Sequence, residues 1–163
     1  MINGPEFARN GEVLHGKIAV ASMSRLEGIL YSDDGMLDYE LAGYINREGK
    51  PAIRCTVRGM LPLVCQRCLE DFAYPVDIVS DLILVEDEGA FEEIDEDDAT
   101  DAVVAAPCLD PLVLVEDEVL LDIPMSPRHP LTQCKMQADA MEIGAEERKA
   151  FATLGVLKAQ DKE

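Results

Sequence analysis

The stretch LDYELAGYINREGKPAIRCTVRG, at residues 37–59, decides the fold. Apolar and polar residues alternate from Leu37 to Ile45 and again from Ile53 to Gly59, which is the two-residue period of half-buried strands. Residues 46–50 between the two runs (NREGK) combine Asn and Gly, the residue types that favour turns. The pattern therefore predicts an antiparallel hairpin with a five-residue connection.

Further elements lie on both sides of this hairpin. Short apolar or alternating stretches at residues 14–20, 60–64 and 76–85 predict additional strands. A helix is predicted over residues 22–30, because Ser24 and Glu27 have the spacing of a capping box. A weaker helical pattern covers residues 146–158.

A second helix is predicted over residues 111–121. Asp110 can accept hydrogen bonds from the first free amides, and Pro111 suits the first helical position because no donor is needed there. We expect Leu112 and Val115 to face the core and Glu116 to face water. The elements together predict an α+β fold: an antiparallel sheet of about four to five strands, open or curled into a partial barrel, packed with two or three helices.

The length of 163 residues suits a single domain spanning residues 1–163. Acidic residues dominate the stretch from Glu86 to Asp101, which contains no Lys or Arg, so we predict a solvated, mobile acidic loop at about residues 86–106. A metal-binding or nucleic-acid-mimicking arm is the alternative for this stretch. A loosely ordered C-terminal tail is expected from about residue 135.

The charge of the chain limits its partners. Against 33 acidic residues stand 14 Lys and Arg, a formal net charge of −19, which disfavours non-specific binding to the phosphate backbone. Any contact with RNA or another partner would need local basic residues, and the candidates are Arg54, Arg58, Arg67 and Arg128. The alternative is that these arginines are solvated residues that discourage pairing at sheet edges.

Several signals predict a soluble, cytoplasmic protein without a membrane partner. No run approaches the roughly 20 apolar residues of a membrane span. The first residues have neither the basic nor the apolar region of a secretory signal. Five cysteines, an odd number, fit a reducing compartment better than a disulfide framework.

Two of these cysteines form a C-x2-C pair, Cys65 and Cys68, with the spacing that lets two thiolates reach one tetrahedral metal ion. His129 and Cys134 could complete a Cys3His zinc site from a Pro-rich segment far along the chain. Two alternatives remain open: the cysteines fill the core as small apolar residues, or the pair is a redox site. A redox site would need a helix N-terminus after the pair, and the strand pattern around it predicts none.

Catalysis is not expected. The chain has only two histidines, His15 and His129, and lacks the nucleophile-elbow, zinc-protease, phosphate-loop and dinucleotide motifs. We therefore predict a non-enzymatic protein with no small-molecule substrate. A hydrolase would require two carboxylates facing each other across a cleft, which a sequence cannot place. Cys55 and Cys108 are assigned no role.

Several blocks, in order along the chain, resemble the YceD family of bacterial large ribosomal RNA subunit accumulation proteins. They are a first strand containing Gly16, the block CQRCLE at residues 65–70, an acidic centre, EDEVLLDIP at residues 116–124, and PRH at residues 127–129 followed by Cys134. The family's motif cysteines, histidine and later cysteine correspond to the four candidate zinc ligands. Two departures are Pro111, where relatives often have an apolar residue, and the lack of the basic tail that some relatives carry.

The resemblance implies a ribosome-biogenesis factor needed for accumulation of large-subunit (23S) ribosomal RNA. Its partner would be precursor rRNA or a basic ribosomal or assembly protein. The acidic charge favours the protein, because opposite charge speeds encounter. The alternative is a zinc-stabilised or thiol-redox module with an indirect link to ribosomes. Neither reading predicts an oligomeric state.

Overall fold

A computed structural model describes residues 1–85, 89, 101–105 and 108–134. The predicted hairpin is confirmed as strands β2 (Met36–Ile45) and β3 (Pro51–Val64), joined by residues 46–50. Strands β1 (Val13–Ala19) and β4 (Asp71–Val85) pair antiparallel with the outer sides of this hairpin. The run predicted as a separate strand at residues 60–64 is the continuation of β3.

The fifth strand corrects two expectations: that the sheet is antiparallel throughout, and that residues 101–104 belong to the acidic loop. β5 (Asp101–Val104) pairs parallel with β4, so the sheet is mixed, in the order β1-β2-β3-β4-β5, and it does not close into a barrel. Residues 101–104 were predicted to belong to the acidic loop. Parallel pairing needs a connection of about a dozen residues or more, and residues 86–100 supply that length. Most of the predicted acidic loop, and the tail from residue 135 with its helical pattern, lie outside the described residues.

Helix α2 (Pro111–Asp122) confirms the second predicted helix, and the Asp110 carboxylate caps it by accepting from the amide of Leu112 at 3.0 Å. Its faces differ from the prediction, because Leu112 is 44% exposed whereas Glu116 is only 8% exposed. Glu116 is turned inward because it accepts a hydrogen bond from the backbone amide of Arg25 at 2.8 Å. Val115 faces the core as predicted, and Leu114 and Val119 complete the apolar face of the helix.

The helix predicted over residues 22–30 is absent. The chain forms two short 3-10 turns, Val20–Ser22 and Ser24–Leu26, and no side chain caps the second. The helical conformation ends at Glu27, whose ψ is 129°, Gly28 follows with φ 89°, and Leu30 pairs with Leu63 at the end of β3. Pairing with the sheet therefore replaces the local helical tendency of this segment.

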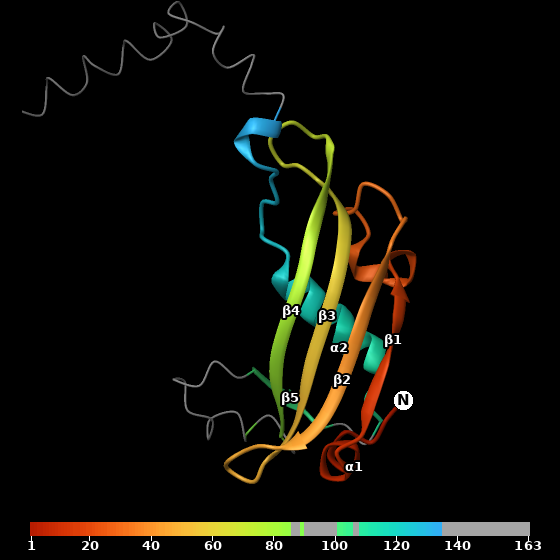
Figure 1. Cartoon of the computed structure of the whole chain (residues 1–163), viewed down its shortest axis with the longest axis vertical. Coiled ribbons are helices and arrows are strands. Elements are labelled where there is room, and N and C mark those ends of the chain that lie inside the picture. The colour runs from red at the N-terminus through yellow and green to blue at the C-terminus, as the bar shows by residue number, and fades with distance from the viewer. Residues whose placement is uncertain (86–88, 90–100, 106–107, 135–163) are drawn as a thin grey trace, which may run out of the picture.

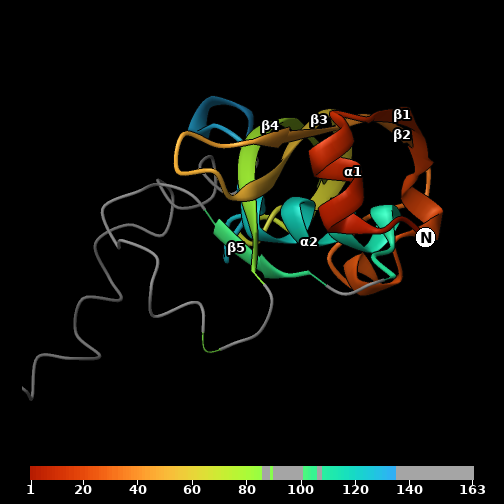
Figure 2. The same cartoon turned by 90° about the horizontal axis from the view of Figure 1, so that it is seen from below.

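A short helix that the sequence analysis did not predict, α1 (Gly4–Asn10), begins at an Asn3 cap and ends at Gly11 in the left-handed conformation. It packs on the sheet where Gly43 lacks a side chain: a Cβ there would lie 2.5 Å from the Phe7 carbonyl oxygen. Both helices lie on one face of the curved sheet, as Figure 2 shows. We call this the inner face, and the core fills the space between it and the helices.

The hairpin of β3 and β4 extends beyond β2, and its end lies at the opposite end of the sheet from α1 and β5 (Figure 1). The 3-10 turn Leu131–Gln133 lies beside this end of the hairpin. No helix in the described part of the chain is long and apolar enough to cross a membrane. The end of the β3–β4 hairpin thus lies next to the segment that follows α2.

Candidate metal centre

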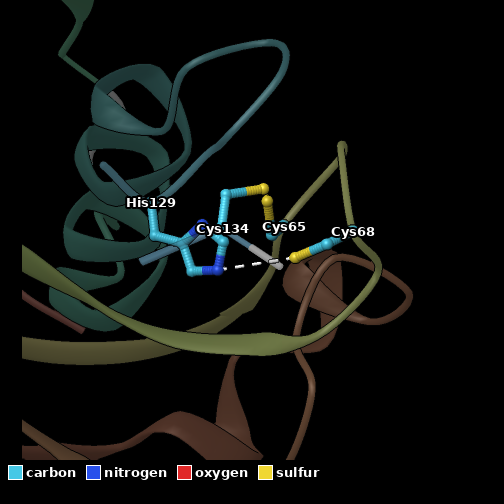
Figure 3. Close-up of side chains that lie close together, drawn as sticks. All are labelled: Cys65, Cys68, His129 and Cys134. Carbon is cyan, nitrogen blue, oxygen red and sulfur yellow. Dashed lines mark hydrogen bonds between the residues drawn. The ribbon is translucent and has the colours of Figure 1, made fainter. Parts of the chain in front are cut away.

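The turn between β3 and β4 brings the C-x2-C pair into position. The amide of Cys65 donates to the carbonyl of Glu70 at 2.8 Å, and the amide of Leu69 donates to the carbonyl of Cys65 at 2.9 Å. Leu69 has a positive φ of 61°, a conformation that residues other than Gly seldom adopt. This compact turn places Cys65 and Cys68 on the same side of the hairpin end (Figure 3).

The segment after α2 reaches the same turn. The amide of Gln66 donates to the carbonyl of Pro127 at 2.9 Å, and Pro127 is fully buried. Two residues further on, His129 is 7% exposed, and Cys134, after the 3-10 turn, is 5% exposed. The structure therefore brings together all four residues that the sequence analysis proposed as zinc ligands, although more than sixty positions separate Cys65 from His129 in the sequence.

One ligand atom from each of the four residues lies within 4.8 Å of the other three. Figure 3 shows the three sulfur atoms and the imidazole converging, with Nε2 of His129 3.4 Å from Sγ of Cys68. In a tetrahedral zinc site with Zn–S bonds of about 2.3 Å, neighbouring sulfurs lie about 3.8 Å apart. Three thiols and one imidazole at these separations could hold a metal such as zinc.

The local electrostatics favour a thiolate at Cys65. Burial by itself would raise the pKa of this thiol, but hydrogen bonds from the backbone amides of Cys68, Arg67 and His129 lower it to about 6. The amide of Glu70 lowers the pKa of Cys68, but burial and the neighbouring thiols raise it more. Crowded thiolates oppose one another's ionisation, and a bound cation would remove that repulsion.

Comparison with known proteins identifies the family. Residues 53–158 match the family model described as large ribosomal RNA subunit accumulation protein YceD. The chain belongs to the YceD family. The matched range contains all four residues of the cluster. The comparisons with curated proteins and with solved structures found no match.

The name of the YceD family implies a role in accumulation of the RNA of the large ribosomal subunit. The description names an accumulating RNA and no chemical reaction, and an RNA or ribosomal partner is consistent with it. The thiol pair lies in a turn between antiparallel strands, with no helix N-terminus directly after it. The helix N-terminus that the redox alternative requires is therefore absent after Cys65 and Cys68 in the described residues.

In this YceD family member, the four arginines considered for RNA or partner contact do not form one patch. Arg54 and Arg58 project from β3 on the outer face of the sheet, away from the helices, and each pairs at 2.9 Å with an aspartate of β4. Arg67 lies in the C-x2-C turn, and Arg128 lies beside His129 and donates to Ser126 at 3.1 Å. Two of the four are thus on the sheet and two are next to the thiol cluster.

The aspartates that neutralise these arginines, Asp77 and Asp81, were not singled out from the sequence of this YceD family member. The Arg54 side chain lowers the pKa of the Asp81 carboxyl, and the Tyr44 hydroxyl also donates to it, at 2.8 Å. Both aspartates point away from the core on a strand whose alternation was recognised. The pairing of these aspartates with the arginines could have been found only from the register of β3 and β4, in which Arg54 faces Asp81 and Arg58 faces Asp77.

Proposed function

We propose that this chain is a non-enzymatic ribosome-biogenesis factor of the cytoplasm, needed for accumulation of 23S ribosomal RNA, that acts by binding a basic ribosomal or assembly protein. The family match over residues 53–158 carries the first part of this proposal. The formal net charge of −19 supports the choice of a basic partner.

The ion pairs of the basic residues on the outer face support a protein partner over direct contact with RNA. Lys17, Arg54 and Arg58, on the outer face of the sheet, each have an aspartate within 2.9 Å. A phosphate that approached these side chains would have to compete with carboxylates already in place, so the face attracts RNA weakly. A cationic protein surface meets the remaining carboxylates without that competition.

We also propose that Cys65, Cys68, His129 and Cys134 bind one zinc ion with a structural role. The ligands come from the end of the β3–β4 hairpin and from the segment after α2, so one ion would hold together parts of the chain that lie far apart in the sequence. Three of the four residues are buried, and Cys68 is half-buried. A site with four protein ligands leaves no open position for a substrate, which is typical of a structural zinc site.

The biological part of the proposal is tested in cells depleted of this protein, by measuring the ratio of large-subunit to small-subunit rRNA at matched growth rate. We expect a selective fall in the large-subunit RNA, restored by the wild-type gene. Cys65→Ser should fail to restore the ratio, whereas Cys108→Ser, which changes an exposed cysteine outside the cluster, should restore it. An unchanged ratio in depleted cells would refute the proposed role.

The zinc part is tested by metal analysis of protein purified under reducing conditions. We expect one equivalent of zinc in the wild type and in Cys108→Ser, and its loss in Cys134→Ser. Loss of the metal should also lower the thermal stability, because metal binding and folding are coupled. Metal-free wild-type protein that remains fully folded would contradict a structural zinc site and favour the core-filling or thiol-redox alternative.

A further inference from the structure

The outer face of the sheet carries an exposed apolar patch near the hairpin end. The register places Met36 and Met60 at the same height on neighbouring strands and pairs Met60 with Pro75. One row further toward the hairpin end, Pro62 pairs with Ala73, and the carbonyl of Pro62 accepts from the amide of the adjacent residue Tyr31 at 2.7 Å. We call this set the methionine patch: Tyr31, Met36, Met60, Pro62, Ala73 and Pro75.

The three largest side chains of the methionine patch are strongly exposed: Tyr31 at 58%, Met36 at 50% and Met60 at 56%. Single exposed apolar residues are common, but contiguous patches on a protein surface mark interaction sites. Methionine is frequent on such surfaces because its flexible thioether adapts to different partners. The patch therefore has the composition of an interface core.

The rim of the patch is acidic. Asp33 and Asp34 are exposed in the loop that leads from Tyr31 to Met36, and Asp71 is exposed at the start of β4. None of these three carboxylates forms an ion pair within the described residues. On the other side of the patch, the arginine of the Arg58–Asp77 pair is already neutralised.

We propose that the methionine patch is the docking surface for a basic protein segment, in which apolar side chains cover the two methionines and Lys or Arg side chains meet the rim. This inference rests on the proposed function and specifies where the partner binds. An apolar centre within a polar, charged rim is the usual anatomy of a protein interface. RNA fits poorly because unpaired carboxylates lie at the rim of the patch, and a second copy of the chain would bring together two molecules that each carry −19.

The test uses the full-length protein immobilised on resin and, as the probe, proteins extracted from purified large ribosomal subunits. Three forms are compared: wild type, the double variant Met36→Ser with Met60→Ser, and the control Val79→Ser. Val79 is 61% exposed on the same face of β4, four residues beyond Pro75. Protein-free 23S RNA serves as a second probe, and thermal unfolding establishes that all three forms are folded.

We expect wild type and Val79→Ser to retain the same basic proteins equally. The double variant should bind them with an affinity lower by roughly a factor of ten or more, which is typical of substitutions at the centre of an interface. A second variant keeps the test valid if the double variant does not fold. Asp33→Asn with Asp34→Asn changes only an exposed loop and should weaken the same binding and make it less dependent on salt.

Equal retention by all forms would overturn the methionine patch as the docking surface and leave the proposed function intact. Binding of protein-free 23S RNA, without binding of the extracted proteins, would overturn both the patch and the choice of a protein partner. Binding of neither probe would also overturn the docking proposal. The rRNA ratio in depleted cells is measured independently, so failure of the docking surface and failure of the biological role are distinguishable.

Discussion

At the scale of single residues, Leu69 shows how tightly the C-x2-C turn is constrained. Its φ of 61° lies in the left-handed region, where the side chain of an L-residue crowds the backbone, yet the leucine is 71% exposed and has little packing to compensate. The amide of Leu69 donates to the carbonyl of Cys65, so the unfavourable conformation serves to close the turn that carries both thiols. Local strain is tolerated here because the turn is held by its hydrogen bonds and by the segment around Pro127.

We predict that Leu69→Gly stabilises the protein by up to about 1 kcal/mol, because glycine adopts this conformation without crowding. Urea unfolding measures the change. The same substitution at Leu121, which is 74% exposed on α2, serves as the comparison and should destabilise by about 1 kcal/mol, because glycine weakens helices. A loss of stability in both variants would show that the turn imposes no strain on Leu69.

At the scale of elements, α2 combines an apolar stripe with two buried carboxylates. Glu116 accepts from the amide of Arg25 and also pairs with its guanidinium at 3.4 Å, which joins α2 to the 3-10 turn Ser24–Leu26. Glu118, 6% exposed, accepts from the hydroxyl of Ser80 on β4 at 2.5 Å. Hydrogen bonds to partners on other elements thus explain why two glutamates lie on the side of the helix that faces the protein.

Burial raises the pKa of Glu118 above its ordinary value of 4.5, so the folded protein binds this proton more tightly than the unfolded chain does. The ionised carboxylate therefore costs stability at neutral pH, and that cost disappears as the pH falls through the raised pKa toward 4.5. We predict that the neutral analogue Glu118→Gln is more stable than wild type at pH 7 and that the difference shrinks on acidification. Urea midpoints along a pH series measure it.

The matched control for this experiment is Glu40→Gln, which removes an exposed carboxyl from β2. It should give a small and nearly constant difference from wild type over the same pH range. A Glu118→Gln variant less stable than wild type at pH 7 would mean that the ionised carboxylate and its bond to Ser80 stabilise the native state.

At the scale of the whole molecule, the net charge and the exposed apolar surface contribute to binding in different ways. The described cations on the outer face are paired with aspartates, while the net charge of −19 remains on the chain as a whole. A field of this kind attracts a basic partner from a distance, and the methionine patch supplies the short-range contact. The thiol cluster lies at the same end of the β3–β4 hairpin as this patch, so a bound zinc ion would also hold the surface in shape.

We predict that binding of a basic large-subunit protein weakens steeply between low and physiological salt, because screening shortens the reach of the acidic charge. The weakening should appear mainly as a slower association rate. Surface plasmon resonance at several salt concentrations separates the association and dissociation rates. Binding that does not change with salt would rule out the net charge as the source of attraction.

Part of this fold could be predicted because its causes are local. The alternation from Leu37 to Ile45 and the turn at residues 46–50 specify the hairpin within a short window. Asp110 and Pro111 specify the start of α2 in the same way. The four residues of the cluster could be proposed because few residue types bind zinc and the C-x2-C spacing is restrictive. The start of α1 carried a comparable signal, an Asn cap before Pro5, that was not used.

The sequence by itself therefore determined the hairpin, the α+β class, the second helix, the excess of negative charge and the membership of the YceD family. Only the tertiary structure decided that residues 22–30 form short turns and a bridge to β3 in place of a helix, that β5 runs parallel to β4, and that Glu116 and Glu118 are buried. It also decided that Arg54 and Arg58 are neutralised and that two methionines meet on an exposed face. The reason is that these features depend on contacts between residues far apart in the chain, whose energies outweigh local preferences and leave no periodic trace in the sequence.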